Sequence, residues 1–102
     1  MPAPNTSPAD YRGPLRNLHP VHQHLPRRPL WLCRVCAAPW PCASARMLMR
    51  VEYRADRVAL SIYMAGQLFD ATADLYRLNP NPAPDPQELF NRFLAWTAQP
   101  PP

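Results

Sequence analysis

The sequence predicts a small, mainly α-helical domain whose first part is a cysteine-rich metal knuckle. Three cysteines fall within ten residues, the apolar residues after them recur with helical spacing, and prolines concentrate outside these segments. We expect a disordered, proline-rich and basic segment over residues 1–29, the knuckle and three helices over residues 30–98, and a disordered tail over residues 99–102. The expected folded part is the size of one small domain.

The N-terminal segment, residues 1–29, holds seven of the sixteen prolines. Each proline fixes its own backbone and turns the preceding residue away from helix. Few apolar side chains are present to offset the entropy that ordering would cost.

No apolar run follows Met1 as a secretory signal would require, so we expect a cytoplasmic protein. The longest apolar segment, residues 58–78, contains two aspartates, so we expect no membrane partner.

Residues 30–42 read LWLCRVCAAPWPC, and their two prolines interrupt any regular structure longer than a short strand. We therefore predict a metal-binding loop. Domains below about 70–80 residues usually need a metal, disulfides or self-association, and clustered cysteines in a reducing compartment favour the metal. The first helix is expected from just after Cys42, with Ser44 as its cap, to about Tyr53.

The second helix is the clearest element, because it starts at a good cap residue, Asp56, and keeps its apolar spacing to Leu78. The apolar positions recur every three or four residues: Leu60, Met64, Leu68, Ala71, Leu75 and Leu78. We place Gln67, Asp70, Asp74 and Arg77 on the opposite, solvated face, where the two aspartates serve as solubilising residues.

The third helix is expected to begin near Pro86, after the segment NPNPAP has ended the second one. Asp85 as cap, proline at the first helical position and Glu88 at the third form a capping-box signature. The helix and its extension carry a wide apolar surface of Leu89, Phe90, Phe93, Leu94 and Trp96.

The cysteines Cys33, Cys36 and Cys42 are the predicted metal ligands. A CxxC pair lets two thiolates converge on one ion, and the positive potential at the start of a helix favours the thiolate of Cys42. Zinc prefers four tetrahedral sulfur or nitrogen ligands, so we expect a histidine as the fourth. We choose His24 because it is nearest in sequence, with His19 and His22 as alternatives.

The three cysteines also permit two roles without a metal. They are either free, buried apolar thiols or, for the CxxC pair, a redox-active pair of the thioredoxin type. The redox pair is disfavoured because such pairs sit in a βαβ unit, which the sequence does not show. Four protein ligands would leave zinc no open position, so the predicted site is structural and no catalytic residue is expected.

The cysteine spacing C-x2-C-x5-C resembles the second part of the pattern of the WhiB-like iron–sulfur regulators of actinobacteria, which also use an upstream cysteine. This likeness implies an iron–sulfur cluster as the alternative cofactor and a redox sensor as a third function. Residues 29–97 also resemble a group of small actinobacterial proteins with a P-x-W-x-C-x2-C-x3-WPC-x2-AR core and an LF-x-RF-x-x-WT ending. That resemblance implies the fold and the metal site but no particular activity.

We interpret the protein as a zinc-binding accessory or adaptor protein that acts through protein–protein interaction or self-association. Phe90, Phe93 and Trp96 are the candidate contacts, although the same side chains would also fill a core. The sequence has no GxGxxG motif and only two glycines, so a dinucleotide- or flavin-dependent enzyme is not expected.

Nucleic-acid binding by a transcriptional regulator is the alternative interpretation. The net charge is +4, and residues 1–57 hold nine arginines against three acidic residues. Arg46, Arg50 and Arg57 recur near helical spacing and are candidates for phosphate contacts. A solvated helix face is the simpler interpretation of these arginines.

Overall fold

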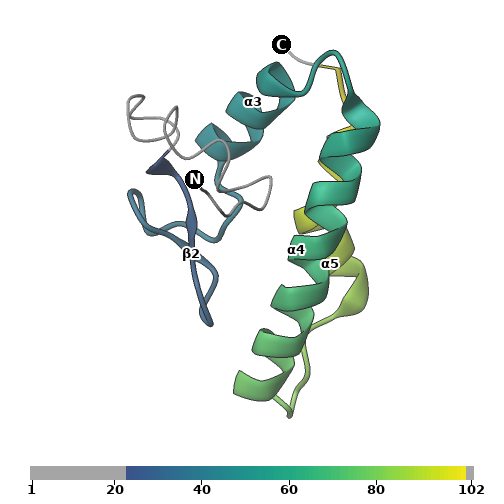
Figure 1. Cartoon of the computed structure of the whole chain (residues 1–102). Helices are drawn as coiled ribbons and strands as arrows, with labels where there is room; N and C mark the ends of the chain where they lie inside the picture. Colours follow the sequence, from purple (N-terminus) through teal and green to yellow (C-terminus); the bar gives the residue numbers. More distant parts are fainter. Residues whose placement is uncertain (1–22, 101–102) are drawn as a thin grey trace, which may run out of the picture.

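The computed structural model describes residues 23–100 and shows the mainly α-helical architecture that the sequence predicts (Figure 1). The proline-rich residues 1–22 and the last two prolines lie outside the described residues. The elements are a hairpin of β1 (Pro26–Arg27) and β2 (Leu32–Cys33), helices α3 (Ala43–Glu52), α4 (Arg57–Leu78) and α5 (Pro86–Phe93), and a 3₁₀ turn η2 (Ala95–Ala98).

The hairpin starts the folded domain earlier than residue 30. Its antiparallel strands pair Pro26 with Cys33 and Arg27 with Leu32. The N–H of Trp31 closes the connecting loop by donating to the carbonyl of Arg27 over 2.6 Å. The high proline content of residues 1–29 led us to expect the start of the folded domain too late in the chain. Proline disfavours a helix but is compatible with an extended edge strand.

The helix starts mostly follow the predicted caps. The carboxylate of Asp56 accepts from the N–H of Ala59 at the start of α4, and Asp85 caps α5. At α3 the cap position belongs to Cys42 rather than to the predicted Ser44. Cys42 has an extended backbone and makes no side-chain cap, which leaves its thiol free to join the other cysteines.

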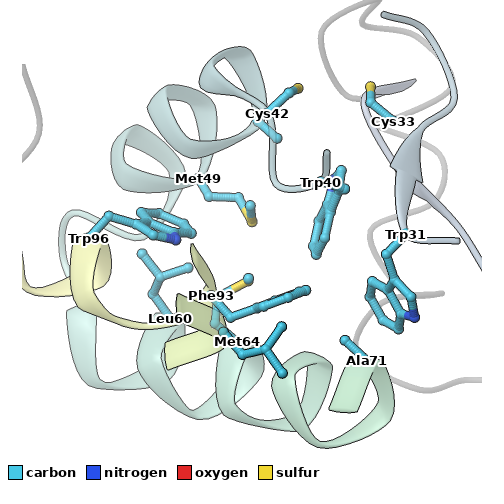
Figure 2. Packing of buried hydrophobic residues seen from close by; sticks show 12 residues of the cluster. Trp31, Cys33, Trp40, Cys42, Met49, Leu60, Met64, Ala71, Phe93 and Trp96 are labelled. Carbon is cyan, nitrogen blue, oxygen red and sulfur yellow. The ribbon is translucent and has the colours of Figure 1, made fainter. Parts of the chain in front are cut away.

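The core lies where the hairpin and the knuckle meet α4 and α5 (Figure 2). Its centre is a cluster of three aromatic side chains that are all fully buried: Trp31, Trp40 and Phe93. The Phe93 ring stands edge-to-face on Trp31 at 5.6 Å between centroids. From α4, the predicted stripe supplies Leu60, Met64 and Ala71, while Leu78 is exposed.

Burial corrects two of the expected partner contacts. Phe93 is 0 % exposed and Trp96 is 4 % exposed, so both belong to the core of the domain. Only Phe90, at 46 %, remains on the surface. Phe93 ends α5 and Trp96 lies in η2, and both of these elements pack on α4.

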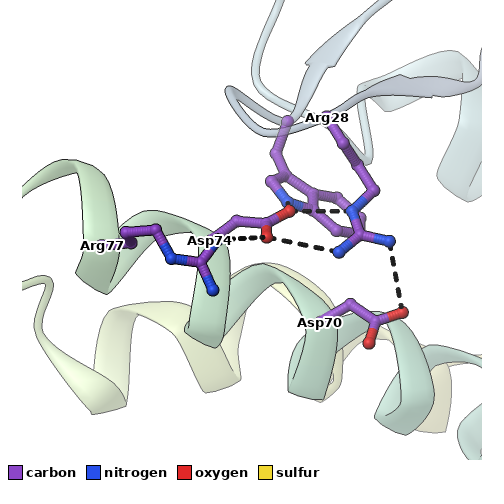
Figure 3. Close-up of polar contacts among 5 residues, drawn as sticks. Arg28, Asp70, Asp74 and Arg77 are labelled. Carbon is purple, nitrogen blue, oxygen red and sulfur yellow. Dashed lines mark hydrogen bonds and ion pairs between the residues drawn. The ribbon is translucent and has the colours of Figure 1, made fainter.

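Asp74 is a second correction, because it is buried rather than solvated (Figure 3). Its carboxylate accepts two hydrogen bonds from Arg28, at 2.8 and 3.2 Å, and one from the indole Nε1–H of Trp31 at 2.9 Å. Arg28 also lies 3.9 Å from Asp70. These contacts anchor the hairpin loop on α4.

Within residues 23–100, no helix combines the length and apolarity of a membrane span.

Candidate metal centre

Four potential ligand atoms converge at one end of the core. They come from His24, Cys33, Cys36 and Cys42, and all lie within 4.8 Å of one another. Nδ1 of His24 is 3.2 Å from Sγ of Cys33 and 3.3 Å from Sγ of Cys42. The cluster is close enough to bind a metal ion. The alternative ligands His19 and His22 lie outside the described residues.

Each ligand comes from a different local structure. His24 precedes β1, Cys33 ends β2, Cys36 lies in the turn that follows, and Cys42 is the residue before α3. Tetrahedral zinc with Zn–S near 2.3 Å and Zn–N near 2.0–2.1 Å separates two sulfurs by about 3.8 Å and sulfur from nitrogen by about 3.6 Å. The observed nitrogen–sulfur distances fall only a few tenths of an ångström short of that value.

A tight turn after β2 brings Cys36 back beside Cys33. The N–H of Ala37 donates to the carbonyl of Cys33 over 3.0 Å, and the N–H of Cys33 donates to the carbonyl of Ala38 over 2.7 Å. The N–H of Val35 points at Sγ of Cys33 over 3.4 Å. Ala37 takes a left-handed backbone with φ of 62° to complete this turn.

The thiols differ in acidity. Burial alone would raise the pKa of Cys33, but hydrogen bonds from the backbone N–H groups of Cys36 and Val35, together with side-chain bonds, lower it to about 6. Burial, together with the neighbouring thiols of Cys33 and Cys36, raises the pKa of Cys42 to about 11, and the N–H of Ala45 at the helix start opposes this only in part. The helix start therefore lowers the pKa of Cys42 by less than burial raises it. A metal would have to displace a proton from this thiol.

Two arginines and one tryptophan hold the backbone around the site. The indole of Trp40 donates to the carbonyl of His24 at 2.9 Å. Arg92 of α5 donates to the carbonyls of Trp31 and Trp40 at 2.7 and 2.8 Å, while Arg46 donates to that of Pro41. Burial, then repulsion from Arg46, lowers the pKa of Arg92.

Sequence reasoning missed the role of Arg92. Its side chain acts on carbonyl groups that lie 52 and 61 residues earlier in the chain. Backbone carbonyls carry no sequence signature, so only the LF-x-RF motif marked this residue, as part of a resemblance.

The three arginines expected to contact phosphates all bind within the chain. Arg46 holds Pro41, Arg50 lies 3.4 Å from Gln99, and Arg57 donates to the carbonyl of Ala98 at 3.3 Å. They tie α3 and the start of α4 to neighbouring segments.

Comparison of the chain with protein-family models, curated proteins and solved structures gives no match.

Proposed function

We propose that this protein binds one zinc ion through Cys33, Cys36, Cys42 and His24, and acts as a non-catalytic interaction module that this ion holds together. The observation that carries the proposal is the convergence of four ligand atoms within 4.8 Å from four separate parts of the chain. Three thiolates and one imidazole are a common donor set for structural zinc.

The surroundings of the ligands support a structural role. Cys33 and Cys42 are buried and belong to the same cluster as Trp31 and Trp40 (Figure 2). An ion here would join the segment before β1 to the start of α3. With all four positions taken by protein atoms, the ion would have no open site for water or substrate.

The spacing of the ligands favours one ion over an iron–sulfur cluster. In a four-iron cluster each thiolate binds a different iron, so the ligands surround a body of several atoms, and four cysteines are usual. This chain has three cysteines, and its four ligand atoms lie within about two metal–ligand bond lengths of one another.

The partner is proposed to be protein rather than nucleic acid. Arg46, Arg50 and Arg57 direct donor groups at acceptors within the chain, which leaves fewer of them for phosphates. Phe90 is the expected contact that stays on the surface. Salt-insensitive association with a protein supports this choice, whereas DNA binding that weakens steeply with salt contradicts it.

The deciding experiment is the metal content and visible absorption spectrum of protein purified without air. We expect one zinc per chain and no colour. Cys36→Ser should lower the zinc content well below one, whereas Val35→Ser, in the same exposed turn, should keep it. Iron with a visible chromophore, or full zinc content in Cys36→Ser, contradicts the proposal.

A further inference from the structure

The outer face of α4 carries an apolar line that no described element covers. Core residues of this helix point to one side, toward the knuckle and α5 (Figure 2). Outside that face, Val58 is 69 % exposed, Ile62 68 % and Phe69 76 %. Large exposed apolar side chains in a contiguous line mark interaction sites.

The line has the spacing of a helix–helix contact. Its members alternate by four and three residues, which is the a/d spacing of a coiled coil. We call them the outer seam: Val58, Ile62, Ala65, Phe69 and Thr72. Over these 14 steps the seam runs for about 21 Å at 1.5 Å per residue.

Phe69 borders an open, mainly apolar hollow on the surface of α4. The hollow is lined by Ala65, Leu68, Phe69, Thr72 and Ala73. At Gly66, one residue along, an added Cβ would have no atom within 4 Å. The hydroxyl of Thr72 donates to the carbonyl of Leu68 over 2.7 Å, so covering it would leave no unpaired donor. A ring of the size of Phe69 suits such a hollow.

We propose that two copies of this chain pair through their outer seams, with the α4 helices antiparallel. The twofold axis crosses the seam at the level of residue 67 along the helix. In this register Phe69 faces Ala65, and Ile62 faces Thr72. Every layer then combines a larger side chain with a smaller one, and each surface is its own complement, as a twofold interface requires.

A parallel pair or a charged peptide would fit the seam less well. A parallel pair would place Phe69 against Phe69 and Ala65 against Ala65, which overfills one layer and leaves a void in the next. The seam itself has no charged residue, so it does not select a charged peptide. A second copy of α4 supplies the matching alternation of large and small residues. The pairing does not depend on the metal site.

The first test is the mass of the zinc-loaded full chain in solution. At about 100 µM we expect twice the 11.6 kDa of one chain. Phe69→Glu should give the single-chain mass with an unchanged circular dichroism spectrum, because this side chain is exposed. Met47→Glu, at an exposed position of α3, is the matched control and should keep the mass of two chains. A monomeric wild type, or a dimeric Phe69→Glu, overturns the proposal.

The second test checks the antiparallel register. Ala65→Phe and Phe69→Ala should each weaken association at least about tenfold, a change of about 1.4 kcal/mol. The double variant exchanges the two members of both symmetry-related Phe69–Ala65 layers, and it should recover most of the affinity. If the wild type is dimeric but the double variant is as weak as the single ones, the antiparallel pairing is wrong.

Discussion

At the scale of single residues, two positions in the knuckle adopt a backbone that side chains disfavour. Trp31 has a φ of 58° and Ala37 a φ of 62°. For Trp31, complete burial and the hydrogen bond to Asp74 offset the strain. Ala37 is exposed and its methyl group has no comparable role. Its conformation completes the turn that returns Cys36 to the ligand cluster.

We therefore expect Ala37→Gly to stabilise the zinc-loaded protein by up to about 1 kcal/mol, because glycine carries no penalty at positive φ. Ala37→Val should destabilise it by about 1–3 kcal/mol, since a branched side chain is more strained there. Urea unfolding measures both. Ala55→Gly, an exposed site without positive φ, should give no gain. If Ala37→Gly loses as much stability as Ala55→Gly, strain at this turn is excluded.

The convergence of the three cysteines and His24 could be predicted from the sequence because ligand chemistry depends on residue type and short spacing. The residues that hold the knuckle in place could not. Arg92 and Asp74 bind groups 43 to 61 residues away, and nothing in their local sequence pattern identifies those partners. The proline content also led to a wrong expectation of disorder for residues 23–29, because this segment contains the first strand, Pro26–Arg27.

At the scale of elements, Asp74 ties the hairpin loop to α4 through three hydrogen bonds. Periodicity predicted α4 from Asp56 to Leu78 correctly, but it ranked Asp74 as solvated because apolar spacing counts only apolar residues. The guanidinium of Arg28, followed by the indole of Trp31, holds the pKa of Asp74 below its usual range. The carboxylate is therefore the form that the folded state prefers.

Asp74→Asn should lower the urea midpoint of unfolding several times more than Asp70→Asn, its partly exposed neighbour one turn away. A depressed folded-state pKa stabilises above the ordinary carboxyl pKa, near 4, and this contribution is lost as the pH falls through the folded value. The gap between wild type and Asp74→Asn should thus narrow below about pH 4. Equal losses for both variants, or a gap that widens in acid, would show that Asp74 does not anchor the hairpin.

At the scale of the whole molecule, the ligand cluster and the aromatic core adjoin each other. The same short segment carries Cys33, Trp31 and Trp40, and Arg92 of α5 binds its backbone. Small domains are marginal, with stabilities of about 5–15 kcal/mol, while structural zinc in finger peptides contributes about 10–16 kcal/mol. Under the proposed function, the stabilising free energy lost with the ion is as large as the whole free energy of unfolding, so the metal-free domain should unfold.

Removal of the metal by a chelator should therefore expose Trp31 and Trp40, shifting tryptophan emission to longer wavelength, and should reduce helicity. Adding zinc back should restore both signals, and chelator already saturated with zinc is the control. Exchange of the Trp40 amide, which donates to the carbonyl of Trp31, should accelerate in the same step. Complete metal loss, verified by elemental analysis, with unchanged emission and melting would mean that the ion does not hold this fold together. The aromatic cluster alone would then be sufficient for stability.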